Sequence, residues 1–499
     1  MKLVFILFDS LNRHLLSPYG GQINTPNFKR LSEKSQTFNK HYVGSLPCMP
    51  ARRDMHTGRL SFLHRSWGPL EPFDNSFPEI LFKNNVYSHL VSDHYHYWED
   101  GGLTYHNRYD SYEFIRGQEG DAWKAMVQPP WERLKEKYDS NQLSTENRNY
   151  FRNNIINREY LLTDEDYPCV QCFNHGIEFL ENNHEADNWL LQIETFDPHE
   201  PFTAPMRFRN NYKTNWKGGI RDWPKYGRVE ELEDEYNELR SNYFALLELC
   251  DEQLGRVLDY FDQNDLWADT GLVVTTDHGF LLGEHDFWAK NRMNMYQEIV
   301  NIPLFLYHPN QNQSQECNSL TQTIDVCPTI LDFFGVDPPS ECQGQSLLRV
   351  DADGFDHREA LIYGYFGGAV NVTNGEYTYH RYPFDLMQQE IFQYTLMPTH
   401  IRQHFSVDEL QHAKLNEPFD FSKGVPLLKV PVVQRSPIHQ YYGPGCMIEN
   451  DTRLYNIIDD PKQQTIVKDS KTESMMTEYI SQLMKWNQAP PEAFTRLQI

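Results

Sequence analysis

Short continuous apolar runs alternate with longer amphipathic segments along the first two thirds of the chain. Apolar runs of this kind predict strands buried on both faces, as in a parallel sheet, and they occupy residues 3–8, 189–195, 272–276 and 302–307. Helical spacing is found at residues 24–38, 229–262 and 323–334, the last of which stops at Gly335. The alternation predicts an α/β fold with a large mixed, mostly parallel sheet between layers of helices, where ligands gather at the carboxyl ends of the strands.

From about residue 360 the pattern changes to short alternating strands, such as residues 360–365 and 377–382, joined by loops rich in Pro, Gln and His. This change predicts a smaller C-terminal α+β subdomain with an antiparallel sheet over residues 356–499, after a catalytic domain over residues 1–355. The sequence contains no internal repeat and no long low-complexity linker. We therefore expect the two parts to pack closely.

The charge of the chain narrows the choice of partners. It has 45 basic and 70 acidic residues, a net charge of −25, and its 23% charged and 39% hydrophobic content is that of an ordinary globular protein. Such a charge repels nucleic acid and anionic membrane surfaces, so neither is an expected partner. No apolar run approaches the roughly 20 residues that span a bilayer. An anionic substrate would be small and held by a few local cations and a metal.

The number and spacing of cysteines indicate the redox state of the cellular compartment. Eight cysteines in 499 residues form no disulfide framework and suit a reducing compartment. Only Cys169 and Cys172 are closely spaced, and a single Cys-x-x-Cys motif indicates ordinary thiols more often than a metal or redox site. The first residues enter a predicted strand directly, so we expect a cytoplasmic protein, or a periplasmic or secreted one if a leader has been removed. The sequence is compatible with a homo-oligomer as well as with a monomer.

One segment places a cysteine where an anion would bind. In residues 46–59, Pro50 suits the first turn of a helix that would reach Thr57 and stop at Gly58. Cys48 would then lie at or just before a helix N-terminus, where free N–H groups and the helix dipole favour an anion, and Arg52 would add a positive charge one turn away. Taken by themselves, these residues fit a buried thiol before a capped helix better than a nucleophile.

The same residues carry a specific resemblance. Cys48-Met49-Pro50-Ala51-Arg52 has the Cys-x-Pro-x-Arg signature of the sulfatase family, in which the cysteine is oxidised to formylglycine. The resemblance covers roughly residues 3–350 and includes the segments 24–31, 57–59, 276–290 and 328–331. It implies membership of the alkaline phosphatase superfamily, a catalytic formylglycine derived from Cys48 and held reactive by Arg52, and maturation by a formylglycine-generating enzyme.

Two strand-end acids suggest a metal site. Asp9 and Asp277 each follow a predicted buried strand, and His278 comes next, so the three side chains would meet at one sheet edge and suit a divalent cation. A strand-end Asp more often caps a turn, but two beside Cys48 favour a metal. The resemblance implies metal ligands Asp9, Ser10, Cys48, Asp277 and His278. Ser10 stands where many sulfatases have an Asp, and His278 where many have an Asn. In these two departures the sequence resembles the phosphonate monoester hydrolases. Calcium is the first choice, with manganese or magnesium as alternatives.

Other polar residues are candidate acids, bases and anion binders. The resemblance implies that His199 contacts the substrate and can act as an acid, that Lys290 binds the sulfate or protonates the leaving group, and that His96 acts as a base. His94 would bind substrate, although it stands where the family has a lysine. As an alternative to these roles, each His could be an ordinary hydrogen-bonded core or surface residue. Residues 116–118 would either bind saccharide or brace a loop.

The sequence therefore predicts a sulfuric ester hydrolase acting on a sulfated saccharide or small organic sulfate. The nearest alternative is a phosphonate monoester or phosphodiester hydrolase that uses the same site, suggested by Ser10 and His278. A third possibility is a two-metal phosphatase, whose nucleophile would be Ser or Thr in place of Cys48. A fourth is a non-catalytic saccharide-binding protein with an unmodified Cys48.

Overall fold

The centre of the protein is an eight-stranded sheet. The computed structural model describes residues 1–143, 148–311, 315–350 and 358–499. In spatial order the sheet contains β14 (Glu316–Cys317), β2 (Gln36–Phe38), β13 (Leu304–Tyr307), β9 (Thr270–Thr276), β1 (Lys2–Phe8), β7 (Trp189–Thr195), β5 (Tyr87–Ser92) and β6 (Ser111–Phe114). In this sheet β13 runs against the other strands. The predicted mixed, mostly parallel sheet is confirmed.

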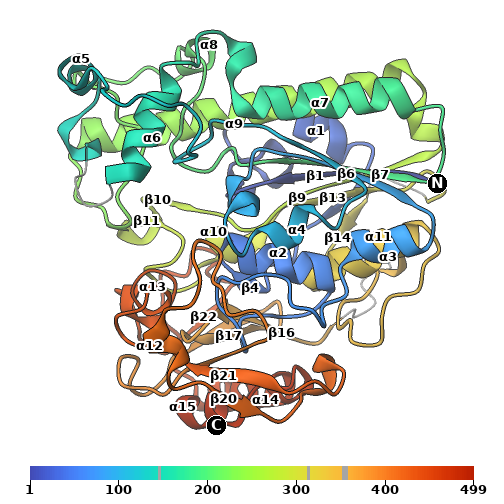
Figure 1. Cartoon of the computed structure of the whole chain (residues 1–499), viewed down its shortest axis with the longest axis vertical. Helices are drawn as coiled ribbons and strands as arrows, with labels where there is room; N and C mark the ends of the chain where they lie inside the picture. Colours follow the sequence, from blue (N-terminus) through green and yellow to red (C-terminus); the bar gives the residue numbers. More distant parts are fainter. Residues whose placement is uncertain (144–147, 312–314, 351–357) are drawn as a thin grey trace.

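Helices cover both faces of this sheet (Figure 1). One face packs on α1 (Pro26–Ser32), α7 (Pro168–Asn183) and α9 (Glu233–Gln263), and the other on α2 (Cys48–Thr57), α3 (Phe77–Lys83) and α11 (Val326–Phe333). Along β1, Val4, Ile6 and Phe8 join the first core, whereas alternate residues such as Leu3 and Phe5 join the second. After Lys2 the strand is apolar at every position, because both of its faces are buried.

Two sequence predictions need correction. The helix predicted over residues 24–38 ends at Ser32, and Gln36–Phe38 form strand β2, because pairing with β13 overrides the local helical spacing. The strand predicted over residues 302–307 is divided at Pro303 into β12 (Asn301–Ile302) and β13. The chain reverses between β9 and β13, and the two strands pair antiparallel.

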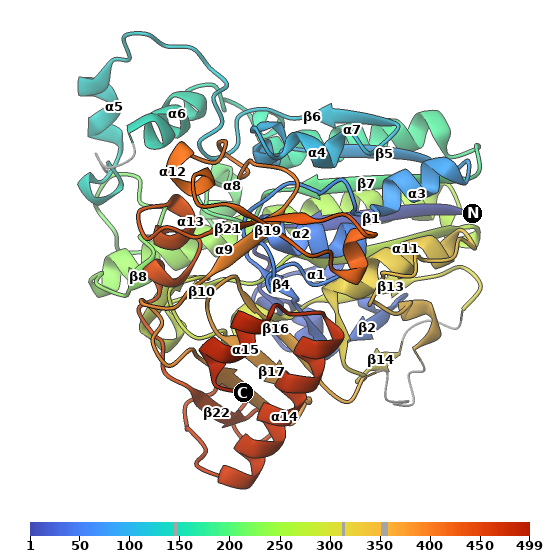
Figure 2. The same ribbon diagram turned by 60° about the horizontal axis from the view of Figure 1, so that its bottom comes forward.

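The C-terminal part contains the predicted antiparallel strands. Its main sheet is formed by β22 (Arg453–Asn456), β18 (Tyr377–Arg381), β17 (Val370–Thr373), β16 (Leu361–Tyr365) and β4 (Ser45–Leu46). Figure 2 shows α14 (Ser470–Trp486) and α15 (Pro491–Leu497) beside this sheet, where they complete a separate apolar core. A second sheet holds β19 (Phe392–Thr395), β21 (Leu427–Pro431) and β20 (Lys414–Asn416). The boundary predicted between residues 355 and 356 lies outside the described residues.

Strand β4 comes from the N-terminal part of the chain but pairs in parallel with β16. Since only Pro47 separates β4 from Cys48, the C-terminal sheet contributes to the position of this cysteine.

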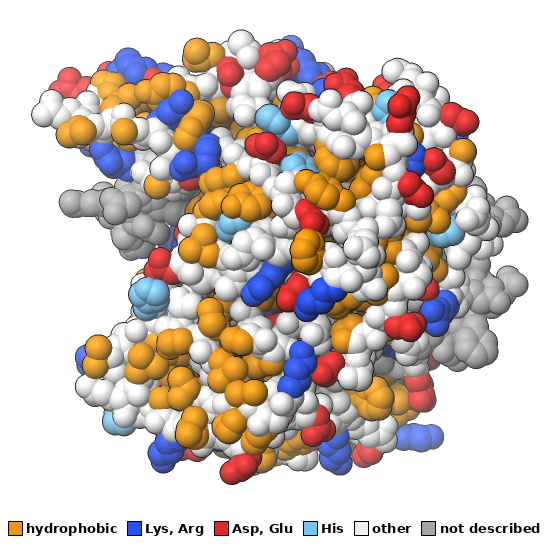
Figure 3. Space-filling model, turned by 45° about the vertical axis from the view of Figure 1, so that its right-hand side comes forward, with side chains coloured by type: hydrophobic (Ala, Val, Ile, Leu, Met, Phe, Trp, Pro, Cys, Tyr) orange, Lys and Arg blue, Asp and Glu red, His pale blue; other side chains and the backbone are white. Residues whose placement is uncertain are grey.

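Shorter elements connect these layers. They are α4 (Leu103–His106), α5 (Trp131–Lys137), α6 (Arg148–Arg158), α8 (Met206–Arg209), α10 (Gln297–Val300), α12 (Val407–Leu410), α13 (Pro437–Gln440), β3 (His41–Tyr42), β8 (Gly227–Arg228), β10 (Leu281–Leu282), β11 (Phe287–Ala289) and β15 (Thr321–Gln322). None of the described helices combines the length and apolar character that a bilayer crossing requires. On the face shown in Figure 3, basic side chains lie among acidic and hydrophobic ones.

Candidate active site

Cys48 is the first residue of α2, as the sequence predicted. Pro50 lies in the first turn of the helix, where its missing N–H leaves no helical hydrogen bond unmade. Gly58 follows the helix with φ of 68°, a left-handed conformation that favours glycine. Every residue of α2 is buried. The helix therefore holds the Cys48 thiol inside the molecule rather than on its surface.

Asp54 fixes this helix to its neighbours. Its carboxylate accepts hydrogen bonds from the backbone N–H of Ser45 in β4, at 2.7 Å, and of Ser61 beyond the helix, at 2.9 Å. Burial raises the pKa of Asp54 to about 7, which shows the cost of enclosing its charge. The two hydrogen bonds join the strand before Cys48 to the loop after α2.

Replacing Asp54 with asparagine is expected to destabilise the protein by about 1–3 kcal/mol, because an amide retains one acceptor and turns its NH₂ group towards a backbone donor. Chemical denaturation of the wild type and Asp54→Asn measures the difference. Glu136→Gln, which changes an exposed acid on α5, is the control and is expected to stay within about 0.5 kcal/mol of the wild type. Equal stability of Asp54→Asn and Glu136→Gln would show that Asp54 does not hold α2.

A cluster of potential metal ligands lies beside Cys48. Asp9 and Asp277 follow β1 and β9, which end in register at Phe8 and Thr276. One ligand atom from each of Asp9, Cys48, Asp277 and His278 lies within 4.8 Å of the others. The predicted strand-end acids thus do meet at one sheet edge.

The orientation of His278 suits a metal. Its Nδ1 lies 3.0 Å from the carbonyl oxygen of Gly279, which fixes the proton there, and its Nε2 lies 3.3 Å from the Sγ atom of Cys48. Ser10 closes the other side of the cluster, since its hydroxyl donates to Asp9 at 2.8 Å and its backbone N–H donates to Asp277 at 3.1 Å. Because the proton of the His278 ring is on Nδ1, the lone pair of its Nε2 atom faces the cluster.

The guanidinium group of Arg52 contacts the carboxylates of this cluster. Its Nε atom is 2.6 Å from Glu194, its Nη1 atom 2.6 Å from Asp277, and its Nη2 atom 3.1 Å from Asp9. The sequence placed Arg52 near an anion, and the structure shows that its nitrogen atoms face protein carboxylates. Only 1% of the Arg52 side chain is exposed, so it acts as an internal counter-charge for the cluster.

The charges within the cluster shift one another. Burial, together with the charge of Asp9, raises the pKa of Asp277 to about 7. Burial also opposes ionisation of Asp9, but neighbouring positive groups, Arg52 and Lys290 among them, outweigh it and hold the pKa of Asp9 well below its ordinary range. Burial and the charge of Asp9 raise the pKa of the Cys48 thiol. Two adjacent carboxylates that resist simultaneous ionisation are a favourable place for a divalent cation.

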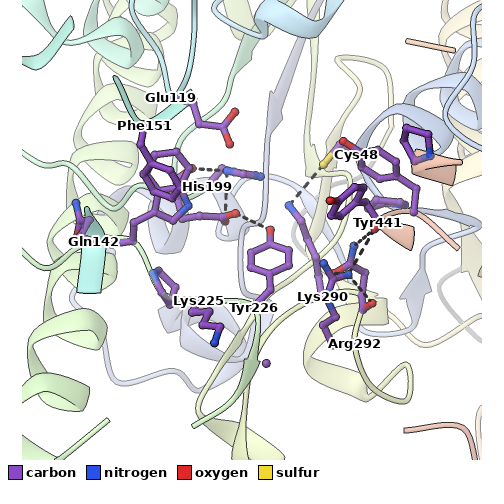
Figure 4. Close-up of a pocket in the computed structure, with 18 of the residues that line it drawn as sticks. Cys48, Glu119, Gln142, Phe151, His199, Lys225, Tyr226, Lys290, Arg292 and Tyr441 are labelled. Carbon is purple, nitrogen blue, oxygen red and sulfur yellow. Dashed lines mark hydrogen bonds and ion pairs between the residues drawn. The ribbon is translucent and has the colours of Figure 1, made fainter. Parts of the chain in front are cut away.

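The cluster opens into a pocket of about 1500 Å³ (Figure 4). Cys48, His96, His199 and Lys290, four of the predicted catalytic residues, line this pocket. The ammonium group of Lys290 lies 3.5 Å from the Sγ atom of Cys48 and 3.3 Å from the hydroxyl of Ser10. Burial tends to lower the pKa of Lys290, but neighbouring negative groups hold it above the ordinary value, so the side chain stays cationic.

The predicted histidines occupy different positions. His96 has its Nδ1 atom 2.6 Å from Glu99 and its Nε2 atom 3.3 Å from Arg402, at the pocket wall. His94 is fully buried, with Nε2 3.7 Å from Asp9, and does not line the pocket. The structure therefore brings His96 to the substrate space and places His94 behind the cluster.

His199 faces the same pocket from another side. Its Nδ1 atom donates to the backbone oxygen of Glu200 at 2.5 Å, which leaves Nε2 available. Burial, followed by the charge of Lys290, lowers the pKa of His199 well below 6.5. In the protein without substrate His199 is therefore neutral.

Several residues of the site were not identified from the sequence. Glu194, an acid inside a strand that is buried throughout, was a signal that could have been noticed. Glu119, Glu200 and Arg402 had no comparable signal, because loops bring them to the pocket. Arg116 pairs with Asp121 at 2.8 Å and so braces a loop.

The fold and this geometry indicate a class of protein. A potential nucleophile at a helix N-terminus, beside a cluster of candidate metal ligands at the carboxyl edge of a mixed sheet, is an arrangement that suits an ester hydrolase.

Comparison with known proteins identifies the family. Residues 2–336 match the Sulfatase family, and residues 283–409 match the family described as N-sulphoglucosamine sulphohydrolase, C-terminal. The chain belongs to the sulfatase family, in the alkaline phosphatase superfamily, and is a sulfuric ester hydrolase. The resemblance found in the sequence is confirmed.

Individual relatives are distant. The chain is 25% identical to the uncharacterised sulfatase YidJ of Escherichia coli, over 70% of each chain, and 23% identical to an N-acetylglucosamine-6-O-sulfatase of Bacteroides thetaiotaomicron, over 73% of this chain and 74% of the relative. The solved structure of BT4656 with its substrate D-glucosamine-2-N,6-O-disulfate superposes with a TM-score of 0.66 at 15% identity, over 98% of this chain and 99% of the other. A phosphonate monoester hydrolase of Agrobacterium radiobacter gives a TM-score of 0.64 at 14% identity, over 97% and 95%. These structures confirm the fold.

Proposed function

We propose that this protein hydrolyses sulfate monoesters of a saccharide or small organic alcohol at Cys48, after conversion of this cysteine to formylglycine and with one divalent cation. The observation that carries the proposal is the meeting of Cys48, Lys290 and the Asp9–Asp277–His278 cluster at one end of the pocket.

The residues of the cluster fit a cation. Asp9, Asp277 and His278 would hold it, together with the side chain at position 48. The Oδ2 atom of Asp9 is buried and accepts no hydrogen bond, although the guanidinium group of Arg52 lies 3.1 Å away. Carboxylate oxygens suit calcium, our first choice, while the imidazole of His278 also suits manganese, and magnesium is a further alternative. When bound, the cation would stabilise negative charge on the sulfate oxygens and on the attacking hydroxyl.

The position of Cys48 fits a formylglycine. As a hydrate, this group supplies two hydroxyls on one carbon, one to attack sulfur and one whose deprotonation allows sulfate to leave. Arg52 maintains the geometry around it by pairing with Asp9 and Asp277. Lys290 reaches the same position from the pocket and would bind sulfate oxygens.

The two pocket histidines would move protons. Glu99 orients the ring of His96 through Nδ1, which makes His96 a base for the formylglycine hydroxyl. His199 has an available Nε2 atom and faces the leaving-group side. An anionic sulfate would favour the protonated ring, and His199 could then donate a proton to the departing alcohol.

Replacing His199 with alanine is expected to reduce kcat/KM for alkyl or sugar sulfates about 10²–10⁴-fold and to affect nitrophenyl sulfate far less, because a phenoxide leaves without a proton. Lys290→Ala is expected to slow both kinds of substrate about equally. Measurement of kcat/KM across phenyl sulfates of graded leaving-group acidity gives the dependence on leaving-group pKa, which should steepen in His199→Ala. An unchanged slope there, with a steeper one in Lys290→Ala, would exchange the two roles.

A phosphonate monoester or phosphodiester hydrolase is the second candidate, favoured by Ser10 and His278 in the cluster. The two functions are distinguished by kcat/KM of the wild type on 4-nitrophenyl sulfate and on 4-nitrophenyl methylphosphonate. We expect the sulfate to be the better substrate. A clear preference for the phosphonate would favour the second candidate, and no turnover of either would count against both.

The remaining expectations concern the cell. A Cys48 site of this kind needs a formylglycine-generating enzyme as a partner during maturation. A cytoplasmic location, with a periplasmic or secreted one as the alternative, and a small anionic substrate remain part of the proposal. The cysteine usage is compatible with the first, and the net charge favours the second.

A further inference from the structure

Two cysteines lie beside the C-terminal end of the helix that begins at Cys48. Helix α11 lies next to α2 (Figure 1), and Cys327 in the first turn of α11 is fully buried. Cys342 comes from the loop after α11, and its Sγ atom lies 3.8 Å from the backbone oxygen of Gly58, which ends α2. A Cβ atom placed on Gly58 would lie 2.3 Å from this sulfur and 3.5 Å from the Cβ atom of Cys327. Both cysteine side chains therefore meet at Gly58.

The two thiols contact each other, and Cys327 donates a hydrogen bond to the sulfur of Cys342. This hydrogen bond lowers the pKa of the Cys342 thiol. The same hydrogen bond, followed by burial, raises the pKa of the Cys327 thiol well above its ordinary value. Cys342 is thus the thiol of the pair that ionises first, and the thiolate is the form that attacks a disulfide.

Access from the solvent separates this pair from the other cysteines. All eight cysteines lie in the described parts of the chain, and Cys342 alone is partly exposed. Cys169 and Cys250 also share a hydrogen bond, but each is 0% exposed, so a dissolved oxidant does not reach them in the folded protein. Cys342 can meet such an oxidant. Cys327 needs no access of its own, because it would attack the sulfur of Cys342 from inside the molecule.

The loop that carries Cys342 is held close to Cys327 by its backbone. The N–H groups of the two residues after Cys342 donate to the oxygen of Gly58 at 2.8 and 3.0 Å. The next N–H group donates at 2.8 Å to Asp325, which directly precedes α11. The loop is therefore attached to the ends of both helices, and a bond between the two sulfurs requires little movement of the chain.

We propose that Cys327 and Cys342 are a redox-sensitive pair that closes to a disulfide and ties the loop at the end of α2 to α11. The oxidant is a low-molecular-weight disulfide such as oxidised glutathione. The Cys342 thiolate attacks one of its sulfurs and displaces a thiolate, which takes up a proton. Cys327 then loses its proton, attacks the Cys342 sulfur of the mixed disulfide and displaces the second thiolate. Two protein thiols are oxidised, and one small disulfide is reduced to two thiols.

Peptide mapping of the wild type provides the first test and requires no turnover, so its outcome is independent of the proposed function. Cleavage before aspartate places Cys317, Cys327 and Cys342 on three peptides, those of residues 286–324, 325–331 and 337–350. The protein is incubated with oxidised glutathione, and the remaining thiols are alkylated under denaturing conditions. The second and third peptides are expected to be joined, and dithiothreitol should separate them. Separate alkylated peptides, or a lasting glutathione adduct on Cys342, would overturn the inference.

Thermal unfolding tests what the bond does. A disulfide that closes the short loop between residues 327 and 342 is expected to raise the melting temperature of the wild type by about 2–4 °C relative to the reduced protein. Cys342→Ser should melt at the same temperature in oxidised and in reduced glutathione. Cys317→Ala, which changes a buried cysteine outside the pair, is the matched control and should keep the wild-type difference. Equal melting temperatures of oxidised and reduced wild type, or a difference that persists in Cys342→Ser, would contradict the proposed tie.

Discussion

Replacing Cys48 with alanine is expected to reduce kcat for 4-nitrophenyl sulfate at least about 10⁴-fold, because the change removes the atoms from which the nucleophile is made. Cys48→Ser is expected to be nearly inactive as well. The fold should survive, since alanine is the best helix former and Cys48 is only the first residue of α2. Steady-state rates and the far-ultraviolet circular dichroism of freshly purified samples give the two measurements.

A matched control distinguishes this site from other buried thiols. Cys317 is fully buried in β14, away from the pocket lining, and Cys317→Ala is expected to keep activity near that of the wild type. The mass of the wild-type peptide that contains Cys48 shows whether the side chain is a thiol or an aldehyde. Wild-type activity in Cys48→Ala or Cys48→Ser would end the formylglycine proposal, and an unmodified thiol in an active enzyme would do the same.

Replacing Asp277 with asparagine is expected to weaken metal binding at least about 100-fold and to reduce turnover with it, because it removes an anionic ligand and one partner of Arg52. Asp9→Asn should act in the same direction. Metal content after dialysis, and the recovery of activity when Ca²⁺, Mn²⁺ or Mg²⁺ is returned to chelated protein, provide the measurements and identify the preferred ion.

Glu194→Gln is the control for the loss of a partner by Arg52. Glu194 contacts Arg52 at 2.6 Å but does not belong to the ligand cluster, so this variant should retain its metal even if its activity falls. A wild-type enzyme that remains active after exhaustive chelation, with no metal detected, would show that Asp9 and Asp277 have another role.

The position of Arg52 also explains why the cluster tolerates burial. Three carboxylates enclosed without a counter-charge would be strongly unfavourable, and the guanidinium group contacts each of them through a different nitrogen. Asp9 and Asp277 would therefore bind both Arg52 and a divalent cation. This arrangement leaves Lys290 as the cation that faces the pocket beside Cys48.

The sequence by itself determined the parts of the fold whose signals are local. Apolar runs predicted β1, β7 and β9, because a strand covered on both faces carries apolar residues on both faces rather than on alternate positions only. Pro50 and Gly58 marked α2, since each has a preferred place at a helix terminus. The acids that follow β1 and β9 could be placed at one edge because parallel strands end on the same side.

Only the tertiary structure decided features that depend on distant partners. The reversed direction of β13 and the strand formed by β2 follow from their pairing, which local spacing does not encode. The role of Arg52 depended on the direction of its side chain, and an arginine one turn after Cys48 can face either an anion or a carboxylate cluster. Glu119 and Glu200 meet because separate loops converge on the pocket, and loop conformation is set by contacts across the fold rather than by local sequence.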